Sequence, residues 1–152
     1  MDSIDIEIIS ILSENSRTPL KAIAEKVYLS SPAVSARIDR LMKAGIIKGF
    51  SVELDEQKLG YPIMAFINLD VQPKHKAQFY KYIEQCPGVL ECNFVTGQYS
   101  MLIKVAFHST HELDSFIGKL QNFGRTSTQI VFSTPVGPRN IRITDDKEAD
   151  TV

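Results

Sequence analysis

Cysteine is scarce in this sequence of 152 residues, which contains only Cys86 and Cys92. Two cysteines so close together are too few for a disulfide framework, and no pair of cysteines or histidines has the spacing of metal ligands. We therefore interpret both as small, buried or half-buried thiols in a reducing compartment.

Long apolar runs are also absent, since no stretch approaches the ~20 apolar residues that a helix needs to cross a bilayer. Residues 1–5 (MDSID) are acidic, where a secretory or mitochondrial targeting peptide would be basic. These absences predict a cytoplasmic protein with no membrane partner.

Recognisable catalytic groups are missing too. His75, His108 and His111 lie beside expected helix starts or strand ends, with no nucleophile, carboxylate pair or metal-ligand spacing around them. No glycine-rich phosphate-binding motif is present. Solvated surface histidines are the favoured interpretation, and we expect a protein that is not an enzyme.

The composition that remains is that of a folded, soluble protein, with 43% hydrophobic and 23% charged residues. The formal net charge of −1 conceals an uneven distribution. Residues 1–16 carry four acids and no base, whereas residues 17–48 carry seven bases against two acids, a local net charge of +5. Residues 144–152 are acidic without an apolar pattern, so we expect a disordered tail there.

Three short helices are predicted in the first third of the chain. Apolar residues at helical spacing behind an acidic first turn predict a helix over residues 3–14. We expect a second helix capped by Thr18 with Pro19 at its first position, and a third capped by Ser31 and ended by Gly45. The short break between the last two is typical of a helix-turn-helix unit. The expected buried stripe of the third helix is Val34, Ile38, Leu41 and Met42.

The third helix, with that stripe turned inward, exposes small residues first and bases later. Small side chains let a helix enter the major groove, which is ~12 Å wide, and the planar donors of Arg37 can address guanine or a phosphate. The later bases are expected to contact phosphates and so position the helix. A merely solvated basic face is the alternative. The predicted DNA-binding residues are Ser31, Pro32, Ser35, Arg37, Arg40, Lys43 and Lys48.

A linker and a second domain are predicted after the helix-turn-helix unit. Apolar and polar residues alternate over residues 46–54, which predicts a short wing or hinge strand. Turn formers and a proline over residues 55–62 mark the boundary. We expect a DNA-binding domain over residues 1–50, a hinge and linker over 51–62, a second domain over 63–143 and the tail over 144–152.

The second domain alternates strands and helices. We expect strands over residues 63–71, 89–96, 100–107 and 126–135, a helix after Pro73 with Phe79, Tyr82 and Ile83 on one face, and a helix capped near Ser109. This βαββαβ order predicts an α+β, ferredoxin-like fold with two helices on one face of a four-stranded antiparallel sheet. Because the strands are apolar on both faces, we expect the bare face to form a symmetric dimer, which also suits reading two DNA half-sites.

Several ordered segments resemble one known family, over residues 2 to about 143. Residues 1–5 match the start of its first helix, residues 29–34 and 45–50 with Arg37 and Leu41 match its reading helix and exit strand, and residues 58–60 match its linker. Residues 87–89, 95–99 and 126–128 fall where its effector domain has signatures. By this order and spacing the sequence is similar to the Lrp/AsnC family of feast/famine transcriptional regulators.

The resemblance implies a ferredoxin-like effector domain, dimers that assemble into octamers, and an amino-acid effector between neighbouring effector domains, with no other cofactor. It implies that Gly97, Gln98, Tyr99 and Ser100 form one wall of the pocket, with Thr126, Thr128 and Ser133 as weaker candidates from a partner. Glycine lets a backbone approach a ligand, and turn N–H groups can hold a carboxylate. A plain hairpin turn is the alternative for Gly97.

Two positions depart from the family pattern. Ser100 stands where the family commonly has an aspartate, the obvious partner for a ligand's α-amino group. Tyr28 stands where the family usually has glycine, and a tyrosine at positive φ would cost on the order of 1 kcal/mol. The sequence thus predicts an effector-sensing regulator that binds double-stranded DNA. An architectural DNA-binding protein without an effector and a small ferredoxin-like enzyme stay as alternatives.

Overall fold

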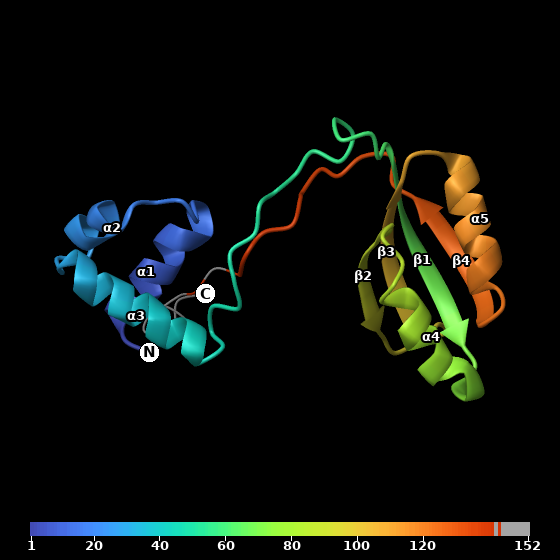
Figure 1. Cartoon of the computed structure of the whole chain (residues 1–152), viewed down its shortest axis with the longest axis horizontal. Coiled ribbons are helices and arrows are strands. Elements are labelled where there is room, and N and C mark those ends of the chain that lie inside the picture. Colours follow the sequence, from blue (N-terminus) through green and yellow to red (C-terminus); the bar gives the residue numbers. More distant parts are fainter. Residues whose placement is uncertain (142, 144–152) are drawn as a thin grey trace, which may run out of the picture. The chain divides into compact units, whose positions relative to one another are not determined.

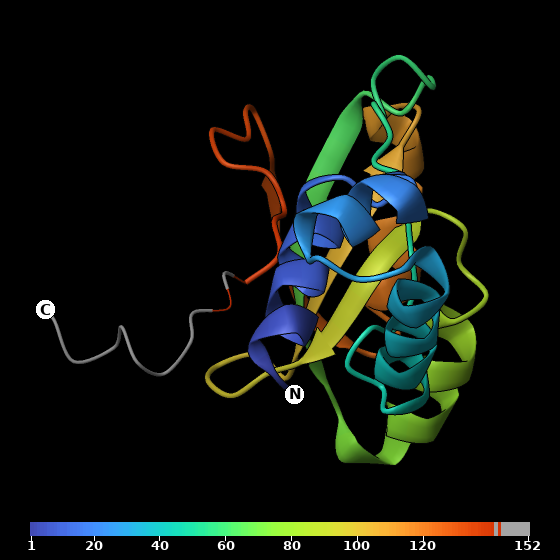
Figure 2. The same cartoon turned by 90° about the vertical axis from the view of Figure 1, so that its left-hand side faces the viewer.

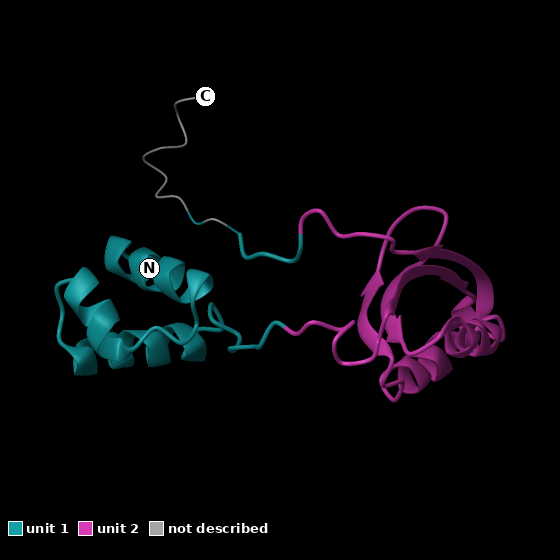
Figure 3. Ribbon diagram, turned by 90° about the horizontal axis from the view of Figure 1, so that it is seen from above, with its two compact units in different colours: residues 1–53, 137–152 teal, residues 54–136 magenta. Residues whose placement is uncertain are grey.

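The computed structural model describes residues 1–141 and residue 143, so the acidic tail predicted over residues 144–152 lies outside the described residues. The chain forms two compact units, residues 1–53 with residues from 137 on, and residues 54–136 (Figure 3). Within residues 1–141, no helix is long and apolar enough to cross a membrane.

The first unit contains three helices, α1 (Ser3–Glu14), α2 (Leu20–Lys26) and α3 (Ser31–Lys43), which confirms the three predicted helices (Figures 1 and 2). Apolar side chains at helical spacing meet in one small core. Its buried members are Ile8, Ile11, Ile23, Ala24, Val27 and Val34.

The helix caps differ from the predicted residues by one position. Pro19, not Thr18, is the N-cap of α2, and the Thr18 hydroxyl instead donates to the Asn15 carbonyl at 2.8 Å. Ser30, not Ser31, caps α3 by accepting from the Ala33 N–H at 3.3 Å. Proline is tolerated throughout a first helical turn, whose N–H groups have no intrahelical partner, so its position does not fix the cap to one residue.

The end of α3 was predicted correctly at Gly45, whose φ is +71°. The Gly45 N–H donates to the Met42 carbonyl, and the Ile46 N–H donates to the Leu41 carbonyl, both at 3.0 Å. These two bonds form a Schellman motif, which requires a left-handed residue that glycine adopts without strain.

Two expectations for this region are wrong. Met42 is 42% exposed, because the apolar stripe of α3 is narrower than predicted and ends at Leu41. Residues 46–54 form no strand, and Phe50, Val52 and Leu54 are 50%, 80% and 58% exposed. A strand needs a partner for its backbone N–H and C=O groups, and a single chain supplies none here.

The second unit has the predicted ferredoxin-like order. Its strands are β1 (Ile63–Val71), β2 (Val89–Phe94), β3 (Met101–Phe107) and β4 (Gly124–Ile130), arranged β2-β3-β1-β4 in one antiparallel sheet. The helices are α4 (Lys76–Ile83), which follows a 3₁₀ turn (Pro73–His75), and α5 (Thr110–Leu120) (Figure 1). The Ser109 hydroxyl caps α5 as predicted, by accepting from the Glu112 N–H at 3.2 Å.

The core of this unit lies between the helices and one face of the sheet. Alternate residues of β1 and β3 point into it, and the predicted face of α4 covers them, with Phe79 and Ile83 buried and Tyr82 half-buried. The buried strand residues are Ala65, Ile67, Leu69, Val71, Met101, Ile103 and Val105.

The last strand is shorter than predicted, because β4 ends at Ile130 and Phe132 is 99% exposed. The register explains this difference. Ile130 pairs with Ala65, two residues from the start of β1, and the Val131 N–H makes a last bond to the Met64 carbonyl at 2.8 Å. Beyond that point β1 offers no partner to the rest of the predicted strand.

Candidate DNA-binding and effector sites

The predicted DNA-binding residues lie on α3 and just beyond it. Four of them are exposed (Pro32, Arg40, Lys43 and Lys48), and three are half-buried (Ser31, Ser35 and Arg37). The exposed members place three positive charges at the C-terminal half of the helix and beyond, where they can reach phosphates. Whether these seven residues contact DNA stays a prediction.

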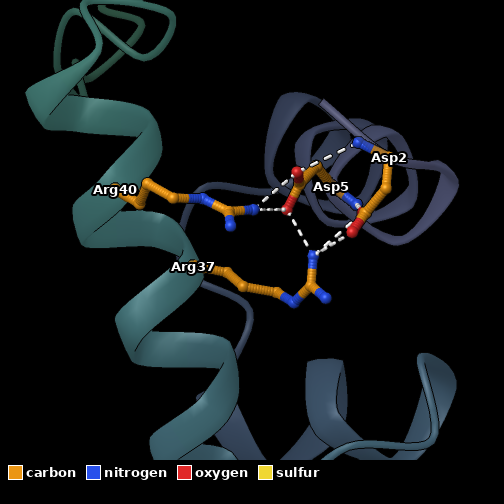
Figure 4. Close-up of polar contacts among 4 residues, drawn as sticks. All are labelled: Asp2, Asp5, Arg37 and Arg40. Atoms are coloured by element: carbon orange, nitrogen blue, oxygen red, sulfur yellow. Dashed lines mark hydrogen bonds and ion pairs between the residues drawn. The ribbon is translucent and has the colours of Figure 1, made fainter.

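Both arginines of α3 have carboxylate partners on α1 that the sequence analysis missed (Figure 4). Asp5 is 1% exposed and accepts from Arg37 Nη1 and Arg40 Nη2, each at 2.8 Å. Arg37 Nη1 also lies 2.7 Å from Asp2 Oδ2. The acids suit the positive end of a helix dipole and the bases suit DNA, so each charge pattern has an explanation without the other. No local signal in the sequence marks this pairing, because Asp5 lies 32 residues from Arg37 and 35 residues from Arg40.

The two aspartates are also tied to each other at the start of α1. The Asp2 carboxylate accepts from the Asp5 N–H at 2.8 Å, and the Asp5 carboxylate accepts from the Asp2 N–H at 3.1 Å. This reciprocal pair is a capping box, which satisfies two backbone donors that a helix start leaves free. The same carboxylates therefore cap α1 and hold it to α3.

Both carboxyl groups titrate below their usual range. Burial raises the pKa of Asp5, but hydrogen bonds from Arg37 and from the Asp2 N–H outweigh burial and lower that pKa. The hydrogen bond from Arg37 is the main reason that the pKa of Asp2 is lowered, followed by the bond from the Asp5 N–H. Two ionised acids thus face two guanidinium groups at neutral pH, and their charges cancel.

The turn between α2 and α3 contains a tyrosine in a left-handed conformation. Tyr28 has φ +55° and a side chain that is 94% exposed. The next N–H, from Leu29, donates to the Ala24 carbonyl at 3.0 Å, which closes the end of α2. Tyr28 therefore takes the strained geometry that its place in the turn requires.

Replacing Tyr28 with glycine is expected to raise the free energy of unfolding by about 0.5–1 kcal/mol. Relief of left-handed strain gives roughly 1–2 kcal/mol, and the greater freedom of glycine in the unfolded chain removes about 0.5–1 kcal/mol. Urea unfolding followed by circular dichroism measures the difference. Tyr28→Ala is the control, because it removes the same ring but keeps Cβ. Equal gains in both variants would contradict the strain account.

The predicted effector residues in the hairpin between β2 and β3 differ in their exposure to solvent. Gly97 has φ +116° and open space around it, Gln98 is exposed, and Tyr99 is half-buried. The Tyr99 ring lies 5.2 Å from the guanidinium carbon of Arg125, a contact that the sequence did not indicate. Positive φ at Gly97 confirms a turn that favours glycine, but it does not test ligand binding.

Ser100 has an internal role that the sequence did not reveal. Its hydroxyl accepts from the Val71 N–H at 3.0 Å and lies 3.3 Å from the Leu69 carbonyl, to which it donates. The Ser100 N–H donates to the same carbonyl at 3.2 Å. These bonds fix the hairpin to the end of β1. The donor that could face a ligand is thus already used.

The partner-side candidates fall at two ends of β4. Thr126 pairs with Leu69 and Thr128 with Ile67, so both threonines share the helix-covered face, and both are half-buried. Thr126 lies at the hairpin end of the sheet, because Leu69 also pairs with Met101. Ser133 follows the opposite end of β4 and is exposed. A single chain therefore does not bring Ser133 to the hairpin, and its supply by a partner stays a prediction.

These features define a class of protein, in which a helix-turn-helix unit is joined to a ferredoxin-like domain with a glycine hairpin. Residues 1–48 match the family model described as winged helix-turn-helix DNA-binding, and residues 64–141 match the Lrp/AsnC ligand binding domain. The chain belongs to the Lrp/AsnC family of transcriptional regulators, as the sequence analysis predicted. It is therefore a DNA-binding regulator with a ligand-binding domain, and not an enzyme.

Individual relatives agree along most of the chain. It is 36% identical over 132 residues to the transcriptional regulator LrpA of Bacillus subtilis, covering 86% of this chain and 97% of that protein. The structure of B. subtilis LrpC superposes with a TM-score of 0.84 at 30% identity, covering 91% and 99% of the two chains. A Neisseria meningitidis regulator in complex with L-Met shares the fold, with a TM-score of 0.84 at 24% identity and coverage of 90% and 93%.

Proposed function

We propose that this regulator binds double-stranded DNA through the exposed face of α3 and alters that binding when an amino acid occupies its C-terminal domain near Gly97. The observation that carries the proposal is the presence, in one chain, of a helix-turn-helix DNA-binding unit and a ligand-binding domain. The same fold holds L-Met in the Neisseria protein. We propose that the protein acts in the cytoplasm, where its DNA target is located.

A dimer formed through the bare face of the sheet is part of this proposal. The strand register places Met64, Phe66 and Leu102 on the face that no helix covers, and each is half-buried in the single chain. Burying them against a second copy removes apolar surface from water. A symmetric dimer would present two α3 helices to half-sites about one DNA turn apart. Further assembly into an octamer is the family expectation.

Phe66→Asp is expected to convert the protein to monomers of 17.0 kDa, because a charge would be buried at the centre of the proposed interface. Light scattering after size-exclusion chromatography measures the mass. Gln78→Asp is the control, since Gln78 is exposed on α4, and α4 packs against the opposite face of the sheet. A Phe66→Asp protein of wild-type mass would exclude this face as the interface.

Thermal melting with each of the twenty amino acids tests the effector part of the proposal. A ligand bound only by the folded state raises the melting temperature by an amount that grows with the ligand's concentration. At a concentration of 100 times Kd, the ligand adds about 2.7 kcal/mol to the free energy of unfolding. We expect a shift for one or a few amino acids, which Gly97→Ala abolishes by straining the hairpin at φ +116°.

An architectural role without an effector is the second candidate function. The observation that favours it is the engagement of the Ser100 hydroxyl with β1, at the position where the family commonly has an aspartate. No shift with any amino acid, in a protein that binds DNA, would support this candidate and refute effector sensing by amino acids.

A further inference from the structure

The two arginines of α3 differ in how firmly the carboxylates hold them. The Arg37 side chain is 24% exposed, and its Nη1 contacts both Asp2 and Asp5. The Arg40 side chain is 60% exposed and uses Nη2 alone, which donates to both oxygens of Asp5 at 2.8 and 2.9 Å. Figure 4 shows both guanidinium groups reaching from α3 to the carboxylates at the start of α1.

Arg40 therefore has donors to spare. A guanidinium group carries five N–H donors in a rigid plane. Among the described residues, Asp5 is the one hydrogen-bond partner of this side chain, so Nε and Nη1 have none. Asp5 is 1% exposed and cannot itself approach DNA, but it fixes one side of an exposed cation on the proposed reading helix.

We propose that Asp5 is a positioning residue for DNA binding. Asp5 binds Nη2 of Arg40 and so orients the remaining N–H donors of that guanidinium group toward a DNA phosphate. Arg37, which binds both Asp2 and Asp5, holds α1 and α3 together. A side chain already held in place loses less rotamer freedom on binding than a free one does. The proposal rests on the proposed function, because it assumes that α3 faces DNA.

A purely electrostatic role and a positioning role of Asp5 predict opposite changes in DNA affinity for Asp5→Asn. Removing an acid beside α3 should strengthen DNA binding if the acid acts only through its charge. If Asp5 positions Arg40, binding should weaken by about tenfold, and the slope of log affinity against log salt should fall by about 0.9 for each phosphate that the protein no longer neutralises. Fluorescence anisotropy with a mixed-sequence duplex of roughly three helical turns measures both, because phosphate contacts do not depend on sequence.

Glu7→Gln is the matched control. Glu7 is exposed on the same helix and belongs to none of these contacts, so the substitution removes the same charge without touching Arg40. We expect its DNA affinity to be unchanged or slightly increased. Asp5→Asn binding as tightly as Glu7→Gln would overturn the positioning role.

A second variant separates positioning from folding. Arg40→Lys keeps the charge at an exposed position but lacks the planar donors that bind Asp5 and a phosphate together. We expect it to retain the wild-type circular dichroism spectrum and melting temperature while its affinity falls by about tenfold, like that of Asp5→Asn. Wild-type affinity in Arg40→Lys would overturn the proposal. A wild-type protein that bound no duplex at all would overturn the proposed function, and this role of Asp5 with it.

Discussion

Gly124→Ala should destabilise the C-terminal domain by about 3 kcal/mol or more, at the upper end of what overpacking costs. A Cβ at this position would lie 1.8 Å from the Asp70 carbonyl oxygen and 2.8 Å from its carbonyl carbon. Those atoms belong to the backbone of β1 and cannot rotate away. The new methyl group must push β4 from β1 at the Val71–Gly124 pair, where their pairing begins.

Urea unfolding of Gly124→Ala, followed by circular dichroism, measures this destabilisation, and Gly118→Ala is its control. Gly118 lies in α5, and an added Cβ would meet nothing within 4 Å. Alanine there is expected to stabilise the domain by about 0.5–1 kcal/mol, because alanine is the better helix former. Similar effects at the two glycines would contradict the close approach of β4 to β1.

Asp5→Ala should destabilise the N-terminal unit by about 2–3 kcal/mol. The substitution removes half of the capping box and leaves Arg37 and Arg40 without their shared buried acceptor. Breaking a fully buried ion pair would cost more, but both guanidinium groups are partly solvated here. Loss of α1 and α3 helicity on thermal melting measures the effect.

The pH dependence of unfolding gives this prediction a second readout. The pKa of Asp5 is lower in the folded protein than its ordinary value of 3.8, so the ionised form stabilises the fold. That contribution is fully present above the ordinary pKa and disappears as pH falls through the folded-state pKa. Acidification from about pH 5 should therefore destabilise the wild type more steeply than Asp5→Ala. Parallel acid profiles would contradict the network.

Local patterns in the sequence predicted most of the fold. The three N-terminal helices, β1 and the capped α5 follow from apolar spacing and from prolines, serines and glycines that begin or end an element. Each of these signals lies within a few residues of the element that it predicts. The order of the strands and helices then pointed to the ferredoxin-like arrangement, which the sheet order confirms.

Contacts between distant residues account for what the sequence did not predict. Ser100 is bound to the backbone of Val71, 29 residues earlier, and Arg40 is bound to Asp5, 35 residues earlier. Nothing near Ser100 or Arg40 in the chain marks these partners. The end of β4 likewise depends on where β1 begins, through the pairing of Ile130 with Ala65. Side-chain partners and strand ends therefore required the folded structure.

The most direct test of the account is a DNA titration with and without amino acids. Genomic fragments retained by the protein would supply the duplex, and the titration would be repeated with each of the twenty amino acids. We expect DNA binding that depends on sequence and a titration midpoint that at least one amino acid shifts, with the shift abolished in Gly97→Ala. Specific binding that no amino acid changes would contradict the claim that this regulator senses one of them.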